Sequence, residues 1–302
     1  MLSHVNSSTL ATLALALAGL VALGVERPRL RGTTLVAPWC WSLISLLAVA
    51  MVEVAGSLAD PADSSSWLVS ARWVAAMTTL CPTMALLGAK RPQDRAWQFV
   101  VLALWGILSA TSVEWLLFGG IVEIHPARFL FLAILVGIGA LNGIATRFWP
   151  ASILTCCGQL ALIDAQGTLL RSWLAGNVRP LVGLALVVAG LAYVAARRAC
   201  PRPAADPWDR IWLDFRDLYG AVWALRVIGR VNAAAAISGL PAILGWRGFF
   251  ASSDADHAGP LPSAVKTSLR SLLRRFVSPQ WIEARLMTSQ ADLATASESR
   301  EA

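Results

Sequence analysis

Apolar runs and short polar segments alternate along the first two thirds of the chain. A helix needs roughly 20 mostly apolar residues to cross the hydrocarbon core of a membrane, and most of the runs approach or reach that length. The pattern predicts seven spans, at about residues 9–25, 35–58, 67–88, 97–118, 127–145, 150–164 and 180–196. We therefore expect an all-α fold in which residues 1–198 form a polytopic transmembrane helical bundle.

The sixth run is the shortest, because residues 151–163 end at Asp164. It falls short of a straight crossing, so a short, a tilted and a re-entrant helix all remain open. Counting it as a crossing places Arg197 and Arg198, which follow the seventh run, on the cytoplasmic side with the other basic segments. The loop-charge rule favours this count, with the N-terminus outside and the C-terminus inside.

A compact basic turn joins the third and fourth runs. Gly88 and Pro92 stop the preceding helix, and the basic residues Lys90, Arg91 and Arg95 mark the turn as cytoplasmic. Two interpretations of these three side chains stay open. They anchor the topology, or they recognise a phosphate-bearing lipid or a partner.

Beyond residue 199 the chain changes character. Apolar side chains recur every three or four residues from Trp208 to Trp223, which predicts a long cytoplasmic helix that extends to Ala236. This helix either covers the inner surface of the bundle or forms a groove for a partner. We expect a cytoplasmic amphipathic helical region at 199–288 and a disordered tail at 289–302.

A second helix of that region, at about residues 263–277, has a basic face beside an apolar one. Its basic face suits the anionic headgroups of a lipid surface. The residues that form it are Lys266, Arg270, Arg274 and Arg275.

Composition agrees with the membrane class, since 57% of the 302 residues are hydrophobic and 14% are charged. These fractions are too apolar for one soluble core. The net charge of +7 is compatible with nucleic acid, but the basic residues collect beside span ends and in the C-terminal third, where topology and anionic lipid explain them. The expected partners are the lipid bilayer, anionic lipid headgroups and a membrane or cytoplasmic protein, and not nucleic acid.

Three charged residues within the predicted spans are the best functional lead. Glu53, Arg72 and Glu114 all fall at a similar depth near the outer ends of their helices. An unpaired charge is costly there, so we expect them to cluster. The cluster is either a structural ion pair with snorkelling side chains or a ligand or proton site that opens outward.

No motif in the chain names a reaction. The five cysteines include no Cys-x-x-Cys pair, and none of the three histidines lies inside a predicted span. We therefore predict no catalytic residue, no metal site and no cofactor. The leading hypothesis is a noncatalytic membrane subunit or an assembly or docking protein. The alternative is a small-solute transporter that uses Glu53, Arg72 and Glu114, and a membrane-embedded enzyme ranks third.

Two stretches carry a resemblance. Residues 86–101 (LLGAKRPQDRAWQFVV) and 212–223 (WLDFRDLYGAVW) are similar to segments of a group of uncharacterised bacterial polytopic membrane proteins. The resemblance covers mainly these two segments. It implies a multi-pass protein of the bacterial cytoplasmic membrane and no particular chemistry, because no activity is assigned to that group.

Overall fold

The computed structural model describes residues 7–59, 65–118, 126–164, 178–200, 206–239, 242–251 and 261–287, with the backbone alone at 65–66, 113–118, 126, 242 and 251. Helices make up this part of the chain apart from one small β-hairpin. The predicted all-α class is confirmed. The predicted tail, 289–302, lies outside the described residues.

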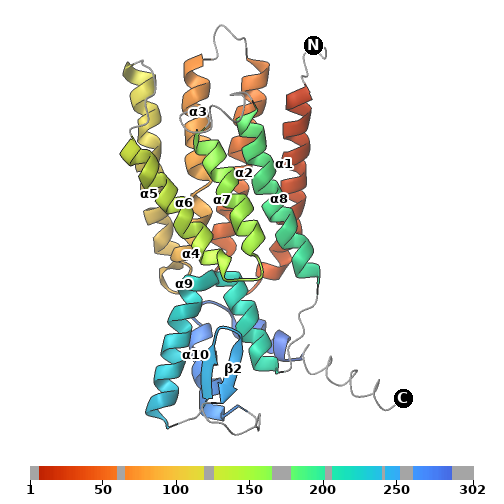
Figure 1. Ribbon diagram of the computed structural model, residues 1–302, viewed down its shortest axis with the longest axis vertical. Helices are drawn as coiled ribbons and strands as arrows, with labels where there is room; N and C mark the ends of the chain where they lie inside the picture. The colour runs from red at the N-terminus through yellow and green to blue at the C-terminus, as the bar shows by residue number, and fades with distance from the viewer. Residues whose placement is uncertain are drawn as a thin grey trace, which may run out of the picture.

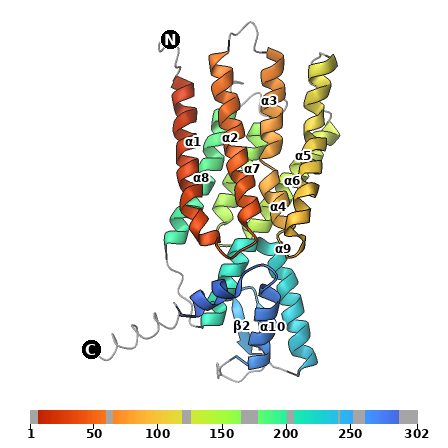
Figure 2. The same ribbon diagram turned by 180° about the vertical axis from the view of Figure 1, so that it is seen from behind.

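A bundle of helices runs along the long axis of the molecule (Figure 1). Helix α2 packs against α1, α3 and α4, while α8 packs against α1 and α7, and the sequence neighbours α6 and α7 contact each other. Figure 2 shows the same arrangement from behind. The helices are α1 (Ser7–Glu26), α2 (Val36–Leu58), α3 (Ser65–Thr78), α4 (Cys81–Leu87), α5 (Gln93–Phe118), α6 (Pro126–Ile144), α7 (Trp149–Ile163) and α8 (Arg179–Ala199), with the 3-10 turn η1 (Arg27–Leu30) after α1.

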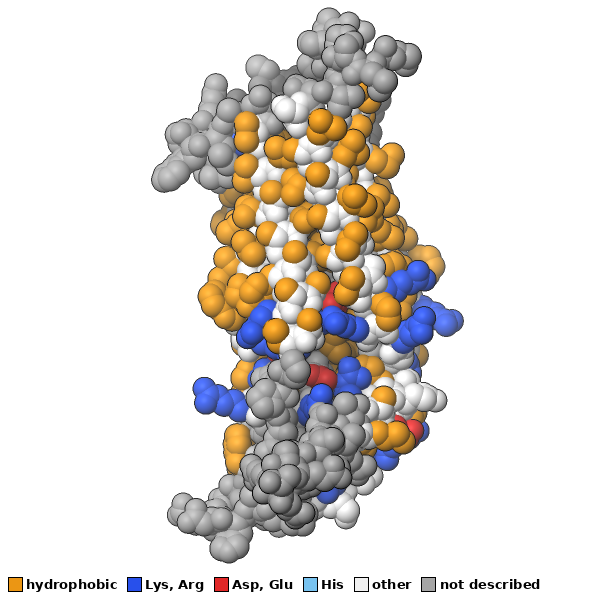
Figure 3. All heavy atoms as spheres, turned by 90° about the vertical axis from the view of Figure 1, so that its right-hand side faces the viewer, with side chains coloured by type: hydrophobic (Ala, Val, Ile, Leu, Met, Phe, Trp, Pro, Cys, Tyr) orange, Lys and Arg blue, Asp and Glu red, His pale blue; other side chains and the backbone are white. Residues whose placement is uncertain are grey.

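The bundle is apolar inside and outside. Side chains such as Met77 and Leu132 have no exposed surface, whereas Met51, Phe99 and Ile107 are each about 70% exposed. Figure 3 shows apolar side chains along the bundle and Lys and Arg side chains at its lower end. Exposed apolar surface of this extent is expected where lipid covers the protein.

Five helical segments of the described chain are long and apolar enough to cross a membrane, which indicates a multi-pass membrane protein. They are Ser7–Leu30, Val36–Leu58, Ala127–Ile144, Arg179–Ala199 and Pro207–Ile237. Helix α7 is a shorter apolar helix of 15 residues.

The predicted third span, 67–88, is two helices rather than one. Helix α3 ends at Thr78 and α4 begins at Cys81. Pro82 has no backbone N–H to donate, so the break between α3 and α4 leaves backbone carbonyls without a hydrogen-bond partner in the helix. Ser45 Oγ donates to the Thr78 carbonyl and Gln159 Nε2 donates to the Thr79 carbonyl, both at 2.7 Å, so buried side chains satisfy the break.

A second unit lies beyond one end of the bundle, which we call the basal end (Figures 1 and 2). This distal unit consists of α9 (Pro207–Ile237), β1 (Ala242–Gly245), β2 (Gly248–Ala251), α10 (Ser263–Leu273) and a further helical stretch at 279–287. Its apolar core includes the aromatic side chains of Trp212, Phe215, Tyr219 and Phe276. Leu30, Leu35 and Ala89 at the basal end of the bundle belong to the same core.

Helix α9 is interrupted at Gly220, whose φ of 75° and ψ of −172° are not helical. The residues before and after it form two segments, 207–219 and 221–237. Neither segment alone has the roughly 20 residues of a straight crossing. Both contact the distal hairpin, since Trp212 of the first segment bonds the Gly245 carbonyl and Asn232 of the second bonds the Leu244 carbonyl. The break within the predicted continuous helix is a correction to the sequence analysis.

The β-hairpin was not predicted from the sequence. Strands β1 and β2 pair antiparallel, with Leu244 opposite Phe249 and Gly245 opposite Gly248. Side chains of α9 hold the hairpin: Asn232 bonds the backbone N–H and C=O of Leu244, and the Asp209 carboxylate accepts from the Phe249 amide. Trp212 Nε1 and Arg216 Nη1 donate to the carbonyls of Gly245 and Trp246 in the same hairpin. The hairpin exists because tertiary contacts complete it, since an isolated two-stranded sheet is only marginally stable.

Candidate functional site

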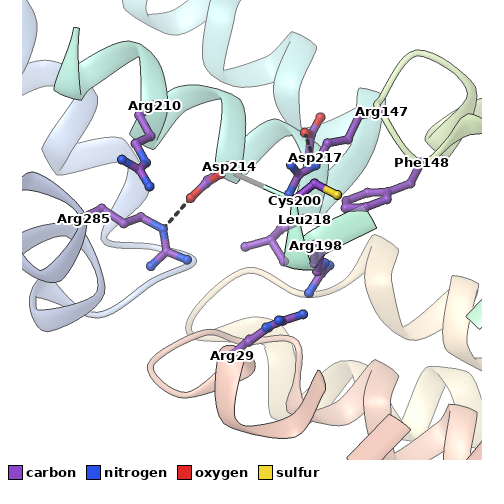
Figure 4. Close-up of a pocket in the computed structure, with 10 residues that line it drawn as sticks. All are labelled: Arg29, Arg147, Phe148, Arg198, Cys200, Arg210, Asp214, Asp217, Leu218 and Arg285. Atoms are coloured by element: carbon purple, nitrogen blue, oxygen red, sulfur yellow. Dashed lines mark hydrogen bonds and ion pairs between the residues drawn. The ribbon is translucent and has the colours of Figure 1, made fainter. Parts of the chain in front are cut away.

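Basic side chains from segments far apart in the sequence meet where the bundle contacts the distal unit. They surround a pocket of about 240 Å³, which we call the arginine pocket. Figure 4 shows the guanidinium groups of Arg29 and Arg198 near each other, with Arg210 and Arg285 beyond Asp214. The lining residues are Arg29, Arg147, Phe148, Arg198, Cys200, Arg210, Asp214, Asp217, Leu218 and Arg285.

One buried carboxylate at the edge of this pocket serves two arginines. Glu26, the last residue of α1, accepts a hydrogen bond from Arg29 Nη1 at 2.8 Å and a second one from Arg198 Nη1. Arg29 follows α1 in the turn η1, and Arg198 lies in the last turn of α8. The packing of α1 on α8 therefore brings the two cations to the same carboxylate.

Two aspartates of α9 pair with other arginines of the site. Asp217 lies between Arg216, at 2.8 Å, and Arg147 of the turn after α6, at 3.3 Å. Asp214 accepts from Arg285 Nε at 2.8 Å. These pairs join α9 to the bundle on one side and to residues 279–287 on the other.

Aromatic rings hold the guanidinium groups in place. The Phe148 ring lies 4.9 Å from the Arg147 guanidinium and 5.1 Å from that of Arg198, and the Trp281 ring lies 3.5 Å from that of Arg285. Burial lowers the pKa of Arg285 below its ordinary value, although the neighbouring Asp214 carboxylate acts in the opposite direction.

A second cavity, of about 340 Å³, extends from the arginine pocket into the bundle. We call it the bundle cavity. The two share Phe148, Arg198, Asp217 and Leu218. The remaining lining comes mainly from α2, α4, α6, α7 and α8. It consists of the two amides Asn142 and Gln159 and of small, hydroxyl and apolar side chains, including Ser42, Thr83, Gly139, Ala140, Gly143, Ser152, Thr155, Gly190, Leu191 and Val194.

The structure places Arg72 directly against Glu53. Arg72 Nε lies 2.8 Å from one carboxylate oxygen and Nη2 lies 2.6 Å from the other, so the pair is bidentate. The side chains are 25% and 12% exposed. The side chain of Glu114 lies outside the described part of the chain, and the predicted three-residue cluster stays a prediction.

The predicted basic turn packs against the distal unit. The Arg91 amide donates to the Arg275 carbonyl at 2.8 Å. Lys90 and Arg275 also line a pocket of about 460 Å³ together with Arg226 and Arg230, and Arg95 is exposed. The turn therefore has a structural contact in addition to its basic side chains.

Helix α10 turns its apolar side chains toward protein. Leu269 and Leu273 have no exposed surface and belong to the distal core. Arg270 pairs with Glu283 at 2.9 Å, and Arg274 is exposed, as is Arg275, whereas Lys266 is half-buried. The contact of this basic face with anionic lipid stays a prediction.

The arginine pocket was not predicted from the sequence, where Arg198 served only as a marker of topology. One available signal was the repeated placement of arginine directly after apolar runs, at Arg29, Arg147 and Arg198. These arginines meet Arg285 only through packing between segments far apart in the sequence, which no local sequence pattern predicts.

Comparison with protein families, curated proteins and solved structures finds no match to this chain. Within the described residues, no group of three or more His, Cys, Asp and Glu side chains is placed to hold a metal ion.

Proposed function

We propose that this protein is a noncatalytic, multi-pass subunit or docking protein of the bacterial cytoplasmic membrane. Its distal unit faces the cytoplasm and holds a partner protein at the membrane surface. The observation that carries this proposal is the way in which the distal unit is fixed to the bundle. A rigidly held unit presents its outer surface in one orientation, as a docking platform requires.

Hydrogen bonds across the junction support that rigidity. Asn142 of α6 accepts from the Val222 amide at 2.9 Å, and Trp246 Nε1 donates to the Ala145 carbonyl at 2.8 Å. Trp223 Nε1 donates to the Leu86 carbonyl at 3.0 Å. Each bond joins a side chain of one unit to the backbone of the other.

The proposed topology has seven spans, with the N-terminus outside. The interruption of α9 and its distal contacts favour placing this helix outside the bilayer. Helix α5, with 26 residues, and α3 together with α4 then supply further crossings, and α7 supplies a short one. The arginines at the basal end favour a cytoplasmic distal unit by the loop-charge rule.

Exposed apolar side chains on the distal unit supply the contact surface of this proposal. Ile237 is 89% exposed and Phe250 is 52% exposed. A photo-crosslinking residue at either position should capture one and the same protein in amounts close to one per chain, whereas the same residue at the exposed Ser271 should not. Equal capture at all three positions, or capture of nothing, would contradict the docking function.

A second candidate function is transport of a small solute. The Glu53–Arg72 ion pair and the interrupted helix at Thr79 are features that transporters use at their binding sites. Gentle purification followed by mass spectrometry separates the two functions. A protein retained at one copy per chain favours docking, and a retained small metabolite favours transport.

A further inference from the structure

The arginine pocket has an excess of positive charge. Four of the arginines that line it, Arg29, Arg147, Arg198 and Arg285, pair with three carboxylates, those of Glu26, Asp214 and Asp217. Asp217 also pairs with a further arginine, Arg216. Charge alone therefore favours an anion in this pocket. Burial strengthens the preference, because the side chains of Arg147 and Arg198 are only 21% and 16% exposed and are poorly screened by solvent.

The guanidinium groups also retain donors for a ligand. In the described part of the chain, Arg29 and Arg198 each donate one hydrogen bond, and both of these bonds go to Glu26. A guanidinium carries five N–H donors in a rigid fork, which matches the oxygen atoms of a phosphate group. Phe148 keeps the Arg147 and Arg198 groups oriented from one side.

The polarity of the connected cavities changes with depth in the bundle. Arginines dominate at the basal end, and small and hydroxyl side chains line the bundle cavity above it. A further cavity of about 90 Å³ continues from there, shares Thr155 and Leu191 with the bundle cavity, and is lined mainly by apolar side chains such as Val49 and Leu184. A molecule with a charged head and an apolar chain has the same gradient.

We propose that the arginine pocket binds the phosphate-bearing headgroup of a membrane lipid whose chain enters the bundle cavity. This proposal goes beyond the docking function and requires only that the bundle lie in a bilayer. The pocket lies at the end of the bundle, where headgroups meet the protein. The adjoining cavity lies among the membrane helices, so a lipid reaches both without leaving the bilayer.

A free phosphate compound is the other source of the same chemistry. It would use the arginines but gain nothing from the bundle cavity. The bundle cavity has a volume of about 340 Å³ and a partly apolar lining, which fits part of a lipid chain and is within the range of about 300–1,000 Å³ of ligand sites. This feature makes us choose the lipid.

The test measures binding of phosphatidic acid in mixed micelles to the delipidated full-length protein, with diacylglycerol as the lipid that lacks phosphate. We expect saturable binding of phosphatidic acid and none of diacylglycerol. R198Q should weaken binding by about tenfold, because it removes a charged donor from the pocket. R197Q is the matched control: it removes the neighbouring charge of the same helix from an exposed position and should change binding less than twofold.

A second pair of variants tests whether the acyl chain of the lipid lies in the bundle cavity. A140F fills the bundle cavity and should weaken phosphatidic acid binding severalfold. The concentration of inorganic phosphate that displaces the bound headgroup from the arginine pocket should stay unchanged. A103F makes the same change on the exposed face of α5 and should have no effect. If R198Q does not fold, R198K keeps the charge beside Glu26 but loses the fork and should still weaken binding severalfold.

Three outcomes overturn the proposal. Equal weakening by R197Q and R198Q would mean a diffuse charge effect. Inorganic phosphate that binds as tightly as phosphatidic acid, with no effect of A140F, would assign the pocket to a soluble phosphate compound. An absence of saturable phosphatidic acid binding would exclude the site.

Discussion

The hydroxyl of Tyr219 lies 3.1 Å from the hydroxyl of Thr34, although 185 residues separate them in the chain. Tyr219 belongs to the first segment of α9 and Thr34 precedes α2. The Tyr219 hydroxyl also donates to the Phe276 carbonyl at 2.8 Å, and the Thr34 hydroxyl donates to the Ala89 carbonyl at 2.5 Å. These bonds join two basal loops of the bundle to α9 and to the segment after α10.

The first prediction tests this junction. Y219F should lower the free energy of unfolding by about 1–3 kcal/mol, because it removes a hydroxyl that bonds Thr34 and Phe276 in a fully buried setting. The chain has only two tyrosines, so Y193F is the natural control and should be close to neutral. Thermal unfolding in detergent measures both. A Y219F variant as stable as the parent would show that the junction depends on apolar packing alone.

The second prediction concerns alkaline pH. Burial raises the pKa of Tyr219 to about 12, whereas an unfolded tyrosine titrates near pH 10. The folded state therefore keeps a proton that the unfolded state loses, and stability should fall as pH rises from about 10 to about 12. In Y193F, where Tyr219 is the remaining tyrosine, tyrosinate absorbance should rise near pH 12. A rise near pH 10 in the folded protein would contradict the burial of this side chain.

The third prediction concerns the interruption of α9. A Cβ at Gly220 would lie 2.3 Å from the Asn142 amide nitrogen, and the backbone there has a positive φ. G220A should therefore cost about 1–3 kcal/mol and loosen the distal unit. G229A lies in the same helix with open space around it and should be neutral or stabilising by up to about 1 kcal/mol. Protease sensitivity of the distal unit compares the two, and equal effects would sink this account of the joint.

The sequence was informative wherever a local pattern decides structure. The length of an apolar run predicts a membrane helix, and the every-third-or-fourth spacing from Trp208 onward predicts α9. The break at Gly220 was not predicted, because a lone glycine in a helical pattern is usually tolerated. Here Asn142 bonds the Tyr219 carbonyl and the Val222 amide on either side of the break, and this partner comes from another helix.

The candidate site was harder to predict from the sequence, because its residues also come from different helices. Glu53 and Arg72 were singled out because a charge within an apolar run is conspicuous. The arginines of the pocket look like ordinary span flanks in the sequence. Only the packing of α1 on α8, and of α9 beneath both α6 and the basal loops, turns these flanks into one pocket.

The fourth prediction tests the proposed topology. Reporters fused after Ala89, Arg147 and Arg198 should report cytoplasm, and reporters fused after Asp63 and Glu123 should report the outside. The decisive fusion is one after Gly176. An outside signal there means that α7, with its 15 residues, completes a crossing. A cytoplasmic signal there removes this crossing and overturns the seven-span topology.

The last prediction separates a structural ion pair from a functional one at Glu53 and Arg72. R72M leaves a largely buried carboxylate without its cation and should lower stability by about 3 kcal/mol. The double variant E53Q/R72M removes both charges and should recover most of that loss. R270M breaks the exposed Arg270–Glu283 pair and should cost no more than about 1 kcal/mol, which makes it the control for loss of an arginine.

Function is then measured on the double variant, because it is the stable form without the charges. If E53Q/R72M no longer retains a small metabolite that the purified parent retains, the pair belongs to a solute site and the transport function gains support. If it retains everything that the parent retains, the pair is structural. An R72M variant as stable as the parent would contradict both readings, since it would mean that the Glu53 carboxylate needs no cation at this depth.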